Sequence, residues 1–430
     1  MSVDIGSNLG RDMYDLIVRL FPICRSITGN GVRETLSIVN EFIPLEVHEV
    51  PTGTRVFDWE VPKEWNIREA YIKDPKGRRI VDFDNNNLHV VNYSMPVHKK
   101  VDLRELKTHL HTLPEHPDWI PYRTSYYNET WGFCIPHTLL EQLEDGMYEV
   151  FIDASLSKGS LTYGEYVLPG ESGEEVLLST HVCHPSLAND NLSGIAMLTF
   201  LARRLADLPR KYTYRFLFIP GTIGSITWLA QNEASIRHVK QGLVVACVGD
   251  SGGPTYKYSR QGDAEVDLAA RHVLKHCGRR ASLLDFSPYG YDERQYCSPG
   301  VNIPVGLFER SKYAEFPEYH TSADNLDFVT AEDLDESFHM ILRIVNILEN
   351  NRKYINQSPM CEPQLGRRGL YDTIGGDKDR ARKQMALLWV LNQSDGDHTL
   401  LDIAERAGID FDVVLNAARL LEEAGLVKAA

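Results

Sequence analysis

Apolar residues near the start of the chain recur at helical spacing. Met13, Ile17 and Leu20 lie three or four positions apart, which places them on one face of a helix. A second run of the same kind follows Arg33. The spacing therefore predicts two amphipathic helices between about residues 12 and 42.

The pattern changes after Val50, where helical periodicity nearly disappears. Short β-rich runs, Ala70–Ile72 and Ile80–Phe83, alternate with turn residues. The stretch Asp74–Gly77 between them has the composition of a hairpin turn. We predict that residues 50–130 form a small β-rich domain that is inserted into a larger fold.

Strand-like and helix-like runs alternate from about residue 148 to residue 328. In the helical run, Ile195, Leu198 and Ala202 share one face behind Ser193 as the N-cap. This alternation is typical of an α/β domain with a mostly parallel central sheet, which we assign to residues 1–49 and 131–365. Strands are expected at Val176–Ser179, Tyr214–Ile219, Leu243–Val248 and Val305–Phe308.

A separate domain is expected over residues 380–430. Two helical runs meet at Gly408, and the closing Gly425–Val427 is typical of the wing of a winged helix. The second helix, Val413–Ala424, offers Arg419 as its only basic residue, beside two glutamates. Because DNA binding needs basic side chains on such a helix, we expect this domain to pack or dimerise and not to bind nucleic acid.

Composition narrows the class of protein. The formal net charge of -15 disfavours a nucleic acid or an anionic membrane as the partner of the whole chain. The seven cysteines are scattered without a CxxC pair, which indicates reduced thiols. No apolar stretch reaches the ~18 residues of a membrane span, and the N-terminal residues lack the apolar core of a signal peptide. We therefore expect a cytoplasmic protein with no membrane partner.

Three polar residues mark a candidate metal site. His181 ends an apolar run, Asp190 lies in the loop that opens the next helix, and His320 lies in a distant loop. Imidazole and carboxylate groups bind Zn²⁺, and three of them leave one position open. A core histidine or a carboxylate at a helix N-terminus is the simpler interpretation of each. His184 is a rival ligand, and Asp324 could orient the imidazole of His320.

These motifs carry a resemblance to a known superfamily. The strand ending in His181, the loop Asn189–Gly194 and the run Tyr319–Thr321 resemble the zinc aminopeptidases, which include aminopeptidase Y and glutaminyl cyclase. Nearly the whole chain is similar to a bacterial family labelled polysaccharide-biosynthesis proteins with an aminopeptidase-like domain, a β-rich insert and a C-terminal winged helix. The resemblance implies a phosphorylase/hydrolase-like fold and one zinc ion on His181, Asp190 and His320. The closer similarity is carried by Asp58–Trp65, Trp131–Cys134, Cys183–Leu187 and Asp292–Tyr296.

The chain departs from that superfamily where its general base is expected. Typical members carry a Glu-Glu pair after the next strand, one residue as base and one as metal ligand, whereas this chain has Gly221 and Thr222. Cys183 stands where an Asp is usual, and the usual second-metal Asp falls near Cys247 or Asp250. The departures favour one metal ion over two.

A hydrolase still needs a proton acceptor for the attacking water. Glu293 is the first candidate, because its loop is expected to face the metal ligands, although a surface charge cluster would have the same sequence. Glu309, at the end of the last predicted strand, is the second candidate. Arg294 and Arg310 could bind a substrate carboxylate. Tyr126 could line the cleft or pack in the core.

These features predict a zinc-dependent metallohydrolase, an aminopeptidase or a carboxypeptidase, that acts on a small peptide or on a peptidyl or N-acyl metabolite. The missing glutamate pair keeps two alternatives open. One is a non-hydrolytic metabolite-binding protein on a degenerate aminopeptidase fold. The other is an acyl-transfer zinc enzyme of the glutaminyl-cyclase kind. The insert and the winged helix would narrow access to the cleft or build a homo-oligomer.

Overall fold

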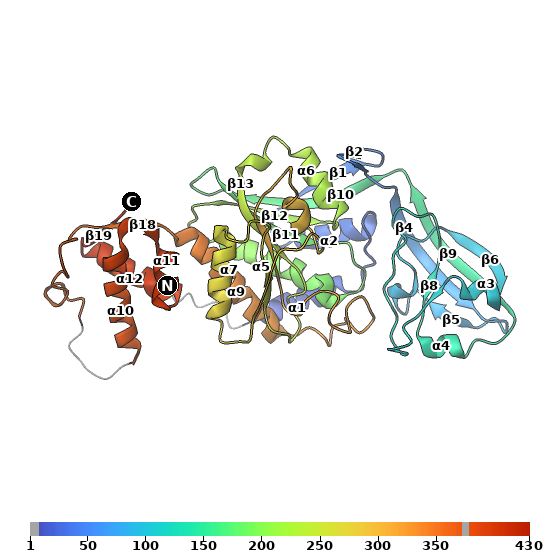
Figure 1. Cartoon of the computed structure of the whole chain (residues 1–430). Helices are drawn as coiled ribbons and strands as arrows, with labels where there is room; N and C mark the ends of the chain where they lie inside the picture. Colours follow the sequence, from blue (N-terminus) through green and yellow to red (C-terminus); the bar gives the residue numbers. More distant parts are fainter. Residues whose placement is uncertain (1–7, 372–377) are drawn as a thin grey trace. The chain divides into compact units, whose positions relative to one another are not determined.

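The computed structural model describes residues 8–371 and 378–430 (Figure 1). The chain forms two compact units. Of the described residues, the first unit comprises 8–264 and 282–339, and the second comprises 265–281, 340–371 and 378–430. Each unit contains at least one β-sheet of its own.

An eight-stranded sheet forms the centre of the first unit. Its inner strands are parallel to their neighbours from β12 through β11 and β13 to β16, whereas antiparallel pairs occur toward both edges. This is the mostly parallel sheet that the alternation of strands and helices predicted. The order across the sheet is β1 (Glu46–Pro51), β10 (Ser160–Leu168), β12 (Thr213–Ile219), β11 (Glu175–His181), β13 (Val239–Val245), β16 (Val305–Glu309), β14 (Thr255–Lys257) and β15 (Ser282–Leu284).

Helices cover this sheet. The helix α5 packs against β11, β12 and β13, and α1 packs against α5. The two helices predicted near the start of the chain are confirmed as α1 and α2. Among the described residues, no helix is both long and apolar enough to cross a membrane. The helices of the first unit outside the insert are α1 (Leu9–Leu20), α2 (Asn30–Asn40), α5 (Gly194–Ala206), α6 (Ile223–Gln231), α8 (Glu293–Tyr296) and the first part of α9 (Ala331–Asn350).

The strand β11 brings the first functional residue into position. Its residues from Val176 to His181 are buried, as expected of a parallel strand that is covered on both faces. The strand ends at His181, which pairs in register with Ile219 at the end of β12. His181 therefore lies at the carboxyl edge of the sheet, where open α/β sheets bind their ligands.

The β-rich insert lies between β1 and β10 and is larger than predicted. Its four-stranded antiparallel sheet has the order β5 (Arg79–Asp82), β4 (Glu64–Lys73), β9 (Met147–Ser157) and β6 (Val97–Asp102). The predicted hairpin at Asp74–Gly77 joins β4 to β5. The boundary at residue 130 is too early, because residues 149–157 of β9 pair with β4. Smaller elements of the insert are β2 (Arg55–Val56), β3 (Trp59–Glu60), β7 (Leu110–His111), β8 (Phe133–Cys134), α3 (Leu103–Lys107) and α4 (His137–Glu141).

The second unit contains the winged helix. Its helix α11 starts with a capping box formed by Thr399 and Asp402 and ends at Gly408, whose φ of 64° favours glycine. The unit begins earlier than the predicted residue 380, because its sheet takes in a strand at residues 353–356. Its elements are α7 (Glu265–Lys275), α10 (Lys378–Gln393), α11 (Leu400–Ala407), α12 (Phe411–Glu423) and the sheet β18 (Asp395–Thr399), β17 (Lys353–Asn356) and β19 (Val427–Ala429).

Candidate metal centre

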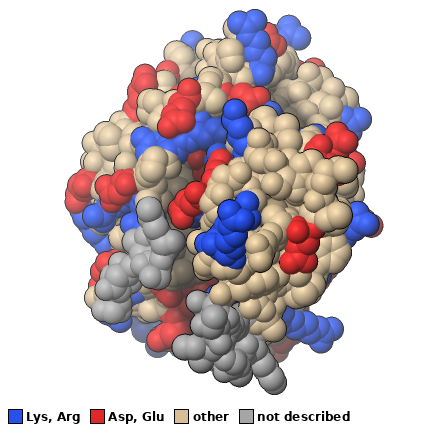
Figure 2. Space-filling model, turned by 90° about the vertical axis from the view of Figure 1, so that its left-hand side faces the viewer, with Lys and Arg blue, Asp and Glu red and all other residues tan. Residues whose placement is uncertain are grey.

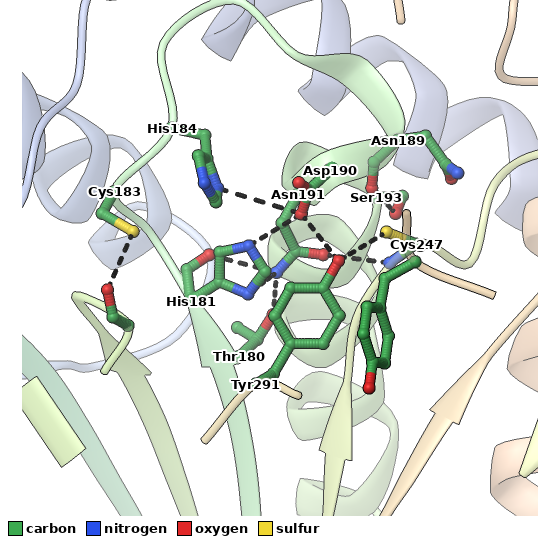
Figure 3. A network of polar contacts seen from close by, with 12 residues as sticks. Thr180, His181, Cys183, His184, Asn189, Asp190, Asn191, Ser193, Cys247 and Tyr291 are labelled. Carbon is green, nitrogen blue, oxygen red and sulfur yellow. Dashed lines mark hydrogen bonds and ion pairs between the residues drawn. The ribbon is translucent and has the colours of Figure 1, made fainter. Parts of the chain in front are cut away.

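Asp190 lies at the centre of a group of histidines. It follows β11 in the turn η2 (Ala188–Ser193), and its side chain is fully buried. Its Oδ1 atom lies 2.9 Å from Nε2 of His181 and 3.8 Å from Nδ1 of His184 (Figure 3). Its Oδ2 atom lies 2.9 Å from Nε2 of His320. The structure thus brings the three predicted ligands together and adds the rival ligand, His184.

The donor atoms of this group fit a metal ion. Oδ2 of Asp190, Nδ1 of His184 and Nε2 of His320 are buried and make no hydrogen bond within the described chain. Two donors bound to one tetrahedral ion at ~2.1 Å lie about 3.4 Å apart, close to the separations observed here. The donor atoms of His181, His184 and Asp190 all lie within 4.8 Å of one another. Because buried polar atoms without partners are costly, a cation that bound them would stabilise the site.

The charges of the site also suit a cation. Burial by itself would raise the pKa of Asp190, but the imidazoles of His184, His181 and His320 outweigh it and hold that pKa well below its usual range. Burial lowers the pKa of His184 well below its usual value, despite the nearby carboxylate. The site therefore presents an anionic carboxylate beside a neutral imidazole, which are the protonation states that metal binding requires.

Asp324 holds the ligand-bearing turn in place. Its Oδ1 atom accepts from the backbone N–H of Asn189 at 2.6 Å, and its Oδ2 atom accepts from the N–H of Asp190 at 2.9 Å. The expectation that Asp324 orients the imidazole of His320 is therefore wrong, because both oxygens bind the opposite loop. His320 itself has a φ of 56°, in the left-handed region, a strained conformation that is found at functional sites.

The insert contributes Tyr122 to the site. The ring of Tyr122 meets the rings of His184 and His320 edge-on, with centroids 5.2 Å and 5.0 Å away. Its backbone N–H donates to the carbonyl of His320 at 2.7 Å. Tyr126, the tyrosine selected from the sequence, lies behind Tyr122 as seen from the histidines. Its hydroxyl is 2.9 Å from the hydroxyl of Tyr122. The sequence displays this aromatic run, but it does not indicate that Tyr122 is the tyrosine that contacts the histidines.

Two more tyrosines of the first unit, outside the insert, cover the histidines. Tyr291 stacks on His181 with ring centroids 4.8 Å apart, and its hydroxyl donates to Oδ1 of Asp190 at 3.3 Å. Tyr319 stacks on its chain neighbour His320 at 4.0 Å. Sequence reasoning assigned neither ring to the site. Together they give the ligands apolar neighbours that limit the access of water.

A cavity of about 150 Å³ opens beside the histidines. His181 and His184 form one part of its wall, and Gly221, Tyr291 and Asp292 form another. The loop after β12 brings no carboxylate into this cavity, in agreement with the sequence. The volume admits one small chemical group at a time.

Asp292 supplies a carboxylate that the sequence did not single out. It is fully buried, its Oδ1 atom accepts from Oγ of Ser225 at 2.7 Å, and its Oδ2 atom has no hydrogen-bond partner among the described residues. A Cβ atom added at Gly221 would lie 3.3 Å from this Oδ2 and 3.2 Å from Cβ of His181. Burial raises the pKa of Asp292. The carboxylate thus takes the space beside His181 that a side chain at position 221 would fill.

The two predicted bases lie outside this cavity. Glu293 begins α8, is buried, and places Oε1 2.5 Å from Nζ of Lys257. Glu309 ends β16, and burial raises its pKa well above its usual value. Neither lines the cavity that His181 and Asp292 share. Asp292, the residue before Glu293, lines this cavity together with His181 and His184 instead.

The two arginines proposed for substrate binding differ in their surroundings. Arg310 is fully buried and forms ion pairs with Asp333 at 3.0 Å and Glu336 at 2.9 Å. Its predicted role is therefore corrected, because internal carboxylates already hold its guanidinium. Arg294 is half-buried, and its guanidinium lies 5.8 Å from the ring centroid of Tyr289 in the cavity wall. Its role in substrate binding stays a prediction.

The position of the usual second metal ion offers a poor ligand. Cys247 places Sγ 3.2 Å from the hydroxyl of Tyr291, and burial raises the pKa of this thiol well above its usual value. The alternative ligand, Asp250, accepts from Nδ2 of Asn189 at 2.8 Å and from Oγ of Ser311 at 2.6 Å. These contacts favour a single metal ion.

Comparisons with known proteins agree with this description. Residues 14–351 match the DUF4910 family, described as a domain of unknown function, and residues 352–429 match a winged helix-turn-helix. A protein of Clostridium acetobutylicum, named as a polysaccharide biosynthesis protein with an aminopeptidase-like domain, is 54% identical over 422 residues. The match covers 98% of this chain and 97% of that protein.

Solved structures share the fold. The crystal structure of a protein from Clostridium acetobutylicum, described as a peptidase, has a TM-score of 0.94 and 52% identity over 98% of both chains. A zinc aminopeptidase from Bacillus subtilis has a TM-score of 0.56 and 14% identity over 79% of this chain and 94% of its own. An aminopeptidase from Aneurinibacillus sp. strain AM-1 has a TM-score of 0.52 and 15% identity over 79% and 93%. The chain therefore belongs to the DUF4910 family, and in this chain a winged helix-turn-helix follows the aminopeptidase-like α/β fold.

Proposed function

We propose that this protein is a metal-dependent hydrolase that removes a terminal residue from a small peptide or from a peptidyl or N-acyl metabolite. The observation that carries the proposal is the buried, anionic carboxylate of Asp190, whose two oxygens face His181, His184 and His320. The aminopeptidase-like fold supports it, since zinc aminopeptidases have the same fold.

The donor set suits one zinc ion. His181, Asp190 and His320 would hold it, with His184 as a further donor, and when bound it would supply Lewis-acid polarisation of the scissile carbonyl. Asp190 contributes the negative charge that balances part of the charge of a cation. The ring of Tyr122 shields the histidines from bulk water, which strengthens the electrostatic interactions inside the site.

The size of the cavity restricts the substrate. About 150 Å³ accommodates a small terminal group and excludes a folded chain. Tyr291 and Tyr319 in its wall offer flat apolar surfaces to that group. Arg294, whose guanidinium lies 5.8 Å from the ring centroid of the wall residue Tyr289, would attract a carboxylate of the substrate. These features favour cleavage at the end of a short peptide.

Metal content and turnover test the proposal together. Protein purified without added metal should hold about one zinc ion per chain. A panel of aminoacyl-p-nitroanilides, dipeptides and N-acyl amino acids should contain a substrate whose hydrolysis stops with a chelator and returns with zinc. Ammonia release from a peptide with an N-terminal glutamine, without cleavage, would favour the acyl-transfer alternative. Saturable binding without turnover by the zinc-loaded protein would favour a binding protein.

A further inference from the structure

We propose that Asp292 accepts the proton of the attacking water, in place of the glutamate that Gly221 and Thr222 do not provide. The inference rests on the proposed hydrolase function. Asp292 enters the site from the start of α8, whereas Gly221 and Thr222 follow β12. A carboxylate at the start of α8 would thus replace the carboxylate that is missing from the loop after β12.

The contacts of Asp292 are those of a pre-organised acceptor. Ser225 fixes its Oδ1 atom through a 2.7 Å hydrogen bond, while its buried Oδ2 atom has no hydrogen-bond partner among the described residues. The residue lines the same small cavity as His181 and His184. The space above Gly221 connects them, because a Cβ there would contact both Oδ2 of Asp292 and Cβ of His181. One oxygen is anchored, and the other can face a reactant.

The other buried carboxylates near the site have different tasks. Both oxygens of Asp190 face histidines, and both oxygens of Asp324 accept backbone N–H groups. Glu293 is ion-paired, and Glu309 lies off the cavity. Within residues 8–371 and 378–430, Asp292 is therefore the carboxylate that lines this cavity and keeps an oxygen without a partner.

The ion pair between Lys257 and Glu293 positions Asp292. Nζ of Lys257 donates to the carbonyl of Ser287 at 3.2 Å, to the carbonyl of Tyr289 at 2.7 Å and to Oε1 of Glu293 at 2.5 Å. These bonds fix the backbone before Asp292 and the side chain directly after it. Lys257 thus holds the segment on both sides of Asp292.

The proton transfer balances without any further reactant. As the water oxygen forms a bond with the scissile carbonyl carbon, one water proton moves to Oδ2 of Asp292. When the C–N bond breaks, that proton passes to the leaving amine. The products are a carboxylic acid and an amine, and the carboxylate of Asp292 is restored for the next cycle.

Asp292→Asn tests the inference on the full chain. The amide keeps the size of the side chain and can still accept from Ser225, but it cannot take a proton. With the best substrate of the panel, kcat should fall about 10²–10⁴-fold while KM and the zinc content per chain stay near wild type. Asp285→Asn makes the same chemical change at an exposed position of the same segment and should retain the wild-type kcat.

A binding measurement tests Asp292 without turnover. Acetohydroxamic acid binds a metal as the acetohydroxamate anion and hands its proton to a neighbouring base. Calorimetry should show that zinc-loaded Asp292→Asn binds acetohydroxamate at least about tenfold more weakly than the wild-type protein, which corresponds to one lost hydrogen bond to a charged group. Equal affinity, or a variant with wild-type kcat and a raised KM, would overturn the inference, since Asp292 would then only anchor the substrate.

Two controls separate the possible failures. Wild-type protein that holds no zinc contradicts the proposed function itself, whereas zinc-loaded wild type and Asp292→Asn that behave alike contradict only the role of Asp292. If circular dichroism shows that Asp292→Asn does not fold, Ser225→Ala replaces it, because this change removes the hydroxyl that contacts Oδ1 of Asp292 and the carbonyl of Thr222 and keeps the carboxylate itself. It should lower kcat about tenfold with zinc retained, and an unchanged kcat would overturn the inference.

Discussion

Asp190 is the residue on which the charge of the candidate metal centre depends. It carries a negative charge although it is fully buried, because imidazoles approach both of its oxygens. His184 and His320 reach this carboxylate at different oxygens, and their rings lie 5.0 Å apart. The two histidines can therefore contribute to the same ion, and their separate removal measures how much each one does.

His320→Ala should remove most of the zinc, since it deletes the donor that faces Oδ2 of Asp190 at 2.9 Å. His184→Ala should weaken zinc binding by at least about tenfold, because its Nδ1 atom belongs to the compact donor group. Elemental analysis and competition with a chelator measure both effects. His339→Ala, which changes a histidine of α9 outside the site, should keep the wild-type occupancy. Full occupancy in His320→Ala would leave His181, His184 and Asp190 as the ligand set.

The buried pair of Lys257 and Glu293 makes a prediction about stability. Lys257→Met should lower the free energy of unfolding by about 3 kcal/mol, because it leaves the carboxylate of Glu293 buried without its counter-charge. The double variant Lys257→Met with Glu293→Met should recover much of this loss. Urea unfolding followed by circular dichroism measures both. Equal losses in the single and double variants would mean that the charge pair does not determine the stability here.

The residues of the centre could be predicted only where their local sequence was distinctive. His181 at a strand end and Asp190 before a helix have signatures that a sequence displays, and the structure brings both together with His320. Asp292 has no such signature, because its role depends on an approach to Gly221 that only the folded backbone creates. Sequence reasoning selected the adjacent Glu293, since the direction of each side chain at the start of a four-residue helix is not encoded in spacing.

At the scale of the elements, Arg33 of α2 forms ion pairs with the central sheet and with the first long strand of the insert. Its guanidinium lies 2.9 Å from Oε1 of Glu49 in β1 and 2.7 Å from Oε2 of Glu64 in β4. The hydrogen bond from Arg33 is the main cause that lowers the pKa of Glu64 to about 2. A carboxyl group whose pKa is lowered by folding stabilises the folded state while it is ionised.

Glu64→Gln should therefore destabilise the protein in a pH-dependent way. The loss should be about 1 kcal/mol near pH 7, where the ion pair is intact but partly screened by solvent. It should shrink as the pH falls from the ordinary pKa of 4.5 toward the folded value of about 2, because the wild-type carboxyl group then also becomes neutral. Thermal unfolding of both proteins at several pH values measures the difference. A difference that does not change over this range would contradict the assignment.

The boundary of the insert shows where prediction of elements fails. The hairpin of β4 and β5 was predictable, because its turn residues lie next to each other in the sequence. The pairing of β9 with β4 joins residues such as Glu149 and Lys73, which are distant along the chain. A strand that alternates between buried and exposed positions fits either sheet, so its partner cannot be derived from its pattern alone.

At the scale of the whole molecule, the winged helix raises the question of whether the protein binds nucleic acid. The helix α12, which would face DNA in such a domain, carries Arg419 as its only basic residue, and Arg419 donates to Oδ1 of Asn350 at 3.0 Å. On the face in Figure 2, Lys and Arg side chains are interspersed with Asp and Glu. The unit also takes in α7, where Nε2 of His272 accepts from the N–H of Phe411 at 2.9 Å. These contacts are internal to the unit.

We predict that the protein does not bind duplex DNA at physiological salt. Phosphate contacts require several Lys or Arg side chains on the recognition helix, and α12 offers only Arg419, whose Nη2 atom donates to Asn350. Fluorescence anisotropy with a short labelled duplex at micromolar protein concentration is the measurement. A signal that rises with protein and falls steeply as salt is added would contradict the prediction and would point to another surface of the unit.

The contact between the insert and the loop of His320 has a consequence for synthesis on the ribosome. The N–H of Ile120 binds Oγ of Ser322, which lies 202 positions later, and Tyr122 binds the carbonyl of His320. Such distant pairings form slowly, because the chain between them must be ordered first. A nascent chain that already exposes His181 still lacks the residues that close the cavity around it. The candidate metal site therefore stays incomplete during translation until the ribosome has added His320.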